Sequence, residues 1–120
     1  MYNPRRMILM VAVAFLSLTP FYNVEAAIFN VSTPAQFQAA LDTAYINGQD
    51  DTINVAAGTY NITTTLIYNY ILSETYSLTI QGAGAGSTIL DGGNSVPILS
   101  VYSVRQVSVK DMTLWNENCF

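Results

Sequence analysis

The chain has 120 residues, of which 51% are hydrophobic, and its four cations against eight carboxylates give a formal net charge of −4. Nucleic acid and anionic membrane surfaces are not expected as partners, because both need clustered lysine and arginine. The chain has no histidine and a single cysteine, Cys119, so it can form no internal disulfide, and neither a metal nor another cofactor is expected.

Residues 1–26 have the pattern of a secretory signal peptide. Two arginines precede an apolar stretch at residues 7–18, and Pro20 and a small-residue site at residues 24–26 follow it. The apolar stretch is shorter than the roughly 20 residues that a membrane-spanning helix needs. We therefore expect cleavage after Ala26 or Ala27, a secreted or cell-surface location, and no membrane span after signal cleavage. An uncleaved N-terminal anchor is the alternative.

The mature chain, residues 27–120, is expected to be small and acidic. It keeps two cations, Arg105 and Lys110, against seven carboxylates, which is a net charge of −5. A domain of this size without disulfides depends on core packing or on repetitive stacking for its stability.

A single helix is predicted over residues 34–46. Thr33 is suited to the N-cap, Pro34 to the first helical position and Gln36 to the third, which is a capping box with its expected proline. Asn47 and the glycine after it mark the end. Apolar residues recur at helical spacing and predict one buried face: Phe37, Ala40, Leu41, Ala44 and Tyr45.

After the helix, the pattern changes to short alternating strands. Apolar pairs occur at Ile53 and Val55, then at Leu78 and Ile80, then at Val107 and Val109, with further strands at residues 88–90 and 98–101. From Ile53 to Leu78 is 25 positions, and from Leu78 to Val107 is 29. Strands that recur at such intervals predict a winding solenoid.

The apolar phase slips near Lys110 and Asp111, because Met112 and Leu114 alternate in the opposite phase to Val107 and Val109. A one-residue slip would turn apolar side chains to the other face of a single strand. The slip therefore predicts a bend between two short strands that face one core.

The glycines of the stretch Gly82 to Ser87, GAGAGS, are expected to form a corner. The spacing differs from that of a dinucleotide fingerprint, the stretch leads into a strand, and no lysine completes a phosphate-binding loop. Glycine permits the positive φ or close approach that a sharp corner requires. The stretch 91–94, DGGN, is predicted to be a turn for the same reason.

These pieces in succession resemble the N-terminal part of secreted right-handed parallel β-helix proteins of the pectin-lyase-like superfamily. The most specific ones are DTI at 51–53 before GTY at 58–60, and the stretch from Ile80 to Gly92 with its ILDG ending. The resemblance implies an all-β fold in which the helix caps the N-terminal end and parallel coils stack behind it. Residues 27–120 would form the cap and about three coils, and we expect them to be the truncated opening of a longer solenoid.

The resemblance also bears on activity. Lyases and hydrolases of this superfamily carry their catalytic groups on middle coils, and none of those motifs matches a position here, so no catalytic residue is assigned. Asp91 and Asp111 lie 20 residues apart, near one coil, and on neighbouring strands they would be about 5 Å apart, within reach of glycosidase or calcium chemistry. The plain alternative is that both are turn formers. Asp50 and Asp51 are read as a solvated turn.

Aromatic residues supply the remaining ligand candidates. Trp115 follows Leu114 in an alternating strand and should point outward if Leu114 points inward. Together with Tyr102, and with Tyr68 and Tyr70 in a predicted loop, it would form a platform for sugars; packing between coils is the alternative. Two sequons, at Asn30 and Asn61, fit the N-glycosylation pattern.

The sequence thus predicts an exported, non-catalytic β-helix segment of a polysaccharide-binding or adhesion-type protein. One alternative is the N-terminal part of a polysaccharide lyase or glycosidase whose active site lies in downstream coils. Another is a compact β-sandwich without a carbohydrate role. Self-association through the open C-terminal coil is also expected, because uncovered strand edges pair readily.

Overall fold

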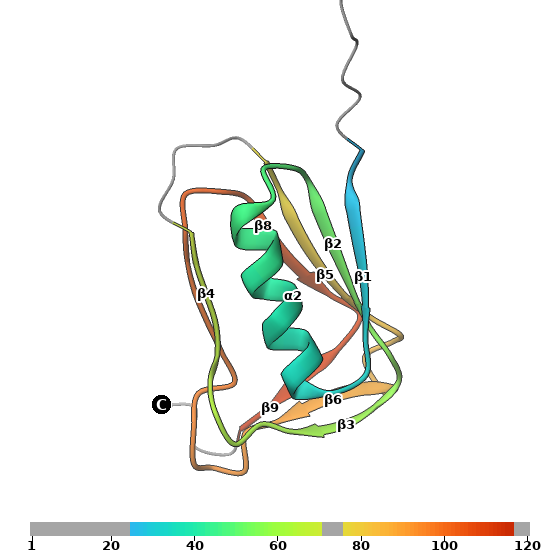
Figure 1. The fold of residues 1–120 in the computed structure, drawn as a ribbon. Helices are drawn as coiled ribbons and strands as arrows, with labels where there is room; N and C mark the ends of the chain where they lie inside the picture. The colour runs from blue at the N-terminus through green and yellow to red at the C-terminus, as the bar shows by residue number, and fades with distance from the viewer. Residues whose placement is uncertain (1–24, 71–75, 117–120) are drawn as a thin grey trace, which may run out of the picture.

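The structure is a computed structural model that describes residues 25–70 and 76–116 (Figure 1). The predictions for the signal peptide up to residue 24 and for Cys119 lie outside these residues. Within them, no helix is long and apolar enough to cross a membrane.

The predicted helix is confirmed with the predicted bounds, as α2 (Pro34–Ile46). The Thr33 side chain accepts a hydrogen bond from the backbone N–H of Gln36 at 3.1 Å. The side chain of Gln36 reaches one residue further back than a capping box requires and accepts from the N–H of Ser32 at 2.9 Å. Four of the five predicted apolar residues are buried, and Tyr45 is half-buried.

The described part of the chain contains nine strands, one before the helix and eight after it. Their bounds are β1 (Ala27–Val31), β2 (Asp51–Val55), β3 (Gly58–Asn61), β4 (Leu66–Tyr70), β5 (Leu78–Gly82), β6 (Thr88–Asp91), β7 (Leu99–Ser103), β8 (Val107–Lys110) and β9 (Thr113–Trp115). Strands β1, β3 and β4 were not predicted, and residues 66–70 were predicted to include a loop.

The strands form three sheets in which every pairing is parallel. Their orders are β1-β2-β5-β8, β3-β6-β9 and β4-β7. The chain visits these sheets in the same order each time: β2, β3 and β4, then β5, β6 and β7, then β8 and β9. Parallel pairing throughout contrasts with the antiparallel sheets of a β-sandwich.

The register corrects one of the two predicted spacings. Leu78 is paired with Val107, as the spacing of 29 residues predicts. Ile53 is paired with Ile80 and not with Leu78, so the offset between the paired strands β2 and β5 is 27 residues. The difference of two residues keeps the same side chains inward, because alternation along a strand has a period of two.

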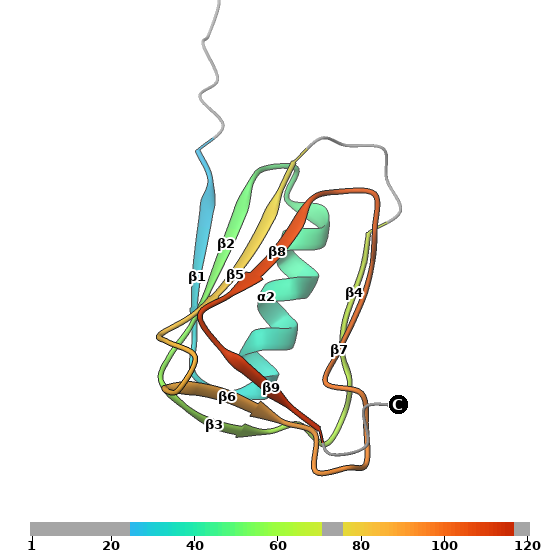
Figure 2. The same cartoon turned by 180° about the vertical axis from the view of Figure 1, so that it is seen from behind.

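The three sheets lie on three sides of α2 in the view of Figure 1, and the helix packs against β1, β2 and β4. β7, β8 and β9 are the last strands of their three sheets, and in the view from behind β8 and β9 lie in front of the helix (Figure 2). Inward-facing residues of successive strands form the core, with Ile53, Ile80 and Leu90 fully buried beside Leu41 of the helix. In residues 25–70 and 76–116 the fold is therefore mostly β, with parallel sheets and one helix around a shared core.

The predicted corners are confirmed. Asp111 has a φ of +57° and separates β8 from β9, where the apolar phase slips. Gly84, with a φ of +150°, lies in the corner between β5 and β6. In the turn after β6, Gly93 and Asn94 both have positive φ. Each corner therefore uses residue types that tolerate this conformation.

Candidate functional site

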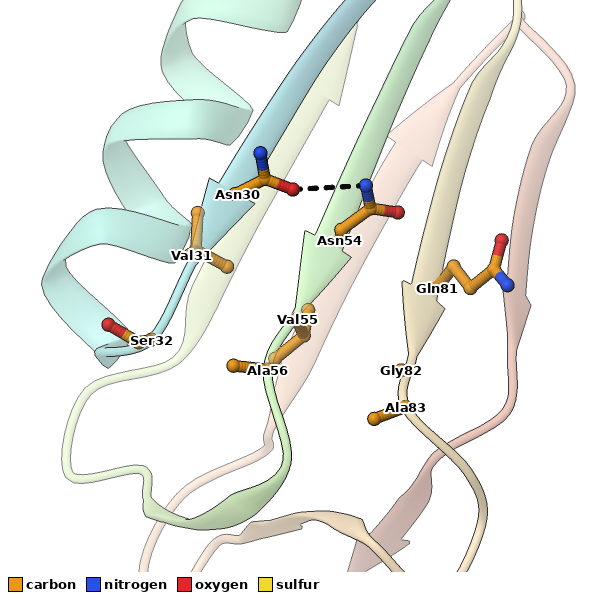
Figure 3. A pocket seen from close by; sticks show the side chains of 9 residues that line it. All are labelled: Asn30, Val31, Ser32, Asn54, Val55, Ala56, Gln81, Gly82 and Ala83. Carbon is orange, nitrogen blue, oxygen red and sulfur yellow. Dashed lines mark hydrogen bonds between the residues drawn. The ribbon is translucent and has the colours of Figure 1, made fainter.

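An open groove of about 410 Å³ crosses the ends of β1, β2 and β5 on the outside of the largest sheet (Figure 3). Each strand contributes three consecutive residues to it, an amide followed by two small or aliphatic residues. These triplets are Asn30-Val31-Ser32, Asn54-Val55-Ala56 and Gln81-Gly82-Ala83.

The amides form a row because the strands are in parallel register. Asn30 is paired with Asn54, and Asn54 with Gln81. The alternation that buries Ile53 and Ile80 points the amides outward. Nδ2 of Asn54 donates to Oδ1 of Asn30 at 3.1 Å (Figure 3). Lys110 occupies the same register position on β8.

Small residues follow the amides on β2 and β5. Gly82 is buried, and a Cβ there would lie 2.2 Å from the carbonyl oxygen of Asp111 and 2.8 Å from Cβ of Met112, so the corner after β8 packs against β5 where a side chain is missing. Ala56 and Ala83, which follow β2 and β5, are exposed and add only a methyl group each. A larger residue at either position would fill the hollow.

The lining is suited to binding and not to acid-base chemistry. Its polar groups are amides and a serine hydroxyl, none of which titrates near neutral pH. Each amide offers both a donor and an acceptor, which matches the neighbouring hydroxyl groups of a sugar. The groove therefore has the chemistry of a site for a hydroxyl-rich ligand.

The acidic candidates are not brought together as a pair. Asp91 is paired in register with Trp115, whereas Asp111 lies in the corner before β9. Oδ1 of Asp91 accepts from the N–H of Gly93 at 2.8 Å, and the carbonyl oxygen of Asp111 accepts from the N–H of Gly84 at 2.9 Å. Both residues act as turn formers, and the register gives no two-carboxylate site.

The aromatic candidates are not brought together at one site either. Trp115 is 53% exposed, and Tyr102 is also exposed. The prediction of a loop at Tyr68 and Tyr70 is wrong, because both belong to β4, and Tyr68 is only 1% exposed. Tyr68 therefore cannot contribute to an outer platform.

The prediction of a solvated turn is correct for Asp50 and wrong for Asp51. Asp50 is exposed and accepts from the N–H of Ser77 at 2.6 Å, and this hydrogen bond lowers its pKa. Asp51 begins β2 and is 2% exposed. Burial raises the pKa of Asp51, because the interior disfavours its charged form.

The buried neighbour of Asp51 is Arg105, which the sequence did not single out. Nη2 of Arg105 lies 3.9 Å from Oδ2 of Asp51, and Oδ1 of Asp51 accepts from Asn47 at 2.6 Å. Nη1 of Arg105 donates to the hydroxyl of Tyr68 at 2.8 Å and to the carbonyl of Ala44 at 3.2 Å. Both charged side chains are fully buried, so the cluster supports the fold and does not face a ligand.

The amide row was missed, although the sequence carries a signal for it. In IFN, TIN and TIQ, at 28–30, 52–54 and 79–81, the outward residue at the end of each alternating segment is an amide. The repeat becomes informative once the register places the three segments side by side.

The described residues contain no group of three or more side chains of the metal-binding types. Comparison of the chain with protein-family models, curated proteins and solved structures gave no match. The resemblance to the pectin-lyase-like superfamily therefore stays a prediction from the quoted motifs.

Proposed function

We propose that this chain is an exported, non-catalytic segment of a right-handed parallel β-helix of the pectin-lyase-like type, and that it binds polysaccharide through the amide groove. Support for the β-helix comes from the order in which the chain visits the three parallel sheets. Right-handed winding follows from the strong preference of parallel crossover connections for that hand. Export, to the cell surface or the medium, is inferred from the N-terminal pattern.

The in-register amide row is the observation that carries the binding function. Parallel strands lie about 4.8 Å apart, so the row presents amides at regular intervals along the groove. A polysaccharide also presents its hydroxyl groups at regular intervals. Several weak hydrogen bonds in register add up to useful affinity, and the open groove admits a chain that is longer than the site.

The first test measures binding of the purified full chain to insoluble cellulose, xylan and chitin, and to the soluble hexaoses of the same three polymers. We expect at least one of these neutral glycans to bind. The double variant Asn54→Ala, Gln81→Ala removes two amides and should weaken that binding by at least about tenfold, since each hydrogen bond contributes about 0.5–1.5 kcal/mol.

The matched control is Thr52→Ala, Thr79→Ala, which alters the same two strands on the same outer face, one alternate position away from the groove. This control should bind as the unchanged protein does. Ala83→Phe should also weaken binding, by filling the groove. An affinity that is unchanged by the loss of both amides, or no binding to any of the glycans, would contradict the proposal.

A further inference from the structure

A second row of side chains crosses the outer face of the sheet β3-β6-β9. Asn61, Asp91 and Trp115 occupy the same register position on the three strands. At an interstrand spacing of about 4.8 Å the row is about 10 Å long, the size of one to two sugar rings. None of the three residues lines the amide groove.

The backbone holds this row in place. The N–H of Gly92 donates to the carbonyl of Trp115 at 3.0 Å, and the N–H of Ile62 donates to the carbonyl of Asp91 at 2.7 Å. The turn after β6 holds the carboxylate of Asp91 through the N–H of Gly93. A fixed carboxylate beside an exposed indole therefore exists before any ligand arrives, which reduces the entropy cost of binding.

We propose that the row formed by Asn61, Asp91 and Trp115 is a second binding site for a neutral sugar. The C–H face of one sugar ring would stack on the indole, and a hydroxyl of the same ring would donate to the carboxylate of Asp91. The amide of Asn61 would contact the neighbouring ring. This inference rests on the proposed function for its class of ligand, but not on the residues of the groove.

The charge of the row selects a neutral sugar over an acidic one. Its only ionised group is the carboxylate of Asp91, so an acidic sugar would meet like charge and no compensating cation within the row. A neutral ring offers hydroxyl donors to the carboxylate, and such charge-assisted hydrogen bonds are stronger than neutral ones.

The chain has one tryptophan, so its fluorescence reports on this row directly. The full chain is produced in a bacterial host without N-glycosylation, because Asn61 begins a sequon and an attached glycan would cover the row. Titration with cellohexaose, xylohexaose or chitohexaose should change the emission of Trp115 saturably. Trigalacturonate, the acidic probe, should leave the emission unchanged.

Two variants test the contacts by calorimetry. Trp115→Ala should weaken the binding of the responding hexaose by about tenfold or more, as loss of an aromatic stacking partner does. Asp91→Asn keeps an oxygen for the turn and removes the charge, and it should weaken binding by about fivefold to tenfold. The matched control, Asp111→Asn, removes an exposed carboxylate outside the row at a positive φ that asparagine tolerates, and should have no effect.

The outcomes separate this inference from the proposed function. If a hexaose binds and the groove variants abolish its binding, but the emission of Trp115 and the affinity of Asp91→Asn are unchanged, the second site is wrong and the groove stands. If trigalacturonate changes the emission as strongly as the neutral hexaoses, the neutral class is wrong. If no probe binds to the unchanged protein, both proposals fail.

Discussion

Arg105 connects segments that lie far apart in the sequence. Its guanidinium donates to the carbonyls of Ala44 in the helix, of Gln49 before β2 and of Tyr76 before β5, and it faces the carboxylate of Asp51. These acceptors are carbonyl oxygens at the ends of the helix and of the connections, which otherwise need partners in the interior. A single buried cation therefore connects the helix to the segments that precede β2 and β5.

Replacing Arg105 should destabilise the protein severely. In Arg105→Met, the carboxylate of Asp51 and several carbonyl groups stay buried without their donor, and we expect the free energy of unfolding to fall by about 3–5 kcal/mol. Urea unfolding followed by circular dichroism measures this. Lys110→Met removes the exposed cation of the described chain and should change stability by less than about 0.5 kcal/mol. Equal stabilities for the two variants would show that the cluster is dispensable.

Gly82 is required by the close approach of the corner after β8. A Cβ there would overlap the backbone of Asp111 and the side chain of Met112. Gly82→Ala should therefore cost about 1–3 kcal/mol of unfolding free energy, as overpacking does. Gly86→Ala is the control, because a Cβ at Gly86 meets nothing within 4 Å, and stability should stay level or rise slightly. A thermal melt of Gly82→Ala that matches the unchanged protein would refute the steric argument.

At the scale of elements, a side chain of the helix hydrogen-bonds to the backbone at the edge of β4, in the place of a neighbouring strand. Oε1 of Gln38 accepts from the N–H of Ile67 at 2.9 Å, and Nε2 of Gln38 donates to the carbonyl of Ile67 at 3.0 Å. One amide group thus satisfies both backbone groups of Ile67, as a paired strand would. An edge protected in this way is less open to pairing with another chain.

Gln38→Ala should expose this edge of β4. We expect a loss of about 1–3 kcal/mol for two hydrogen bonds, together with faster hydrogen exchange at the amide of Ile67. Thr43→Ala is the control on the same helix, since the Thr43 hydroxyl bonds only to the carbonyl of Ala39 among the contacts described and does not reach β4. Unchanged protection of the Ile67 amide in Gln38→Ala would mean that the amide pair does not protect the edge.

At the scale of the whole molecule, the two ends of the stack differ. The helix covers one end, whereas at the other end β7, β8 and β9 are the edge strands of their sheets in the described chain (Figures 1 and 2). Leu114 is 47% exposed although its register partner Leu90 is fully buried. The same inward position is therefore covered on β6 and exposed on β9.

We expect the chain to self-associate through this end, because paired edges satisfy backbone groups and cover apolar side chains. Sedimentation at increasing concentration should show dimers or larger species. Leu114→Lys should shift the protein toward monomer, whereas Ile28→Lys, on the exposed β1 strand at the other edge, should not. A monomer at all concentrations would refute this expectation, and a reversed result for the two variants would assign the contact to β1.

The sequence predictions succeeded for features that depend on residues close together in the sequence. The helix bounds and the corners at Gly84 and Asp111 were predicted correctly, because capping and positive φ depend on residues within a few positions. Trp115 is exposed, but so is its neighbour Leu114, which the alternation alone does not predict. Strands β1, β3 and β4 were missed, because their pairing with β2, β6 and β7 joins segments that lie far apart in the sequence.

The sequence by itself determined the local conformations of this protein: one capped helix, short alternating strands and glycine-marked or aspartate-marked corners. Only the tertiary structure decided which strands are neighbours, and with that the burial of Asp51 and Tyr68, the partners of Arg105 and the two outer rows of side chains. The physical reason is separation along the chain. Asn30 and Asn54 are 24 residues apart, and Arg105 and Ala44 are 61 apart, so no local preference specifies these contacts. They form because packing the parallel sheets together buries a shared core, and burial selects the register.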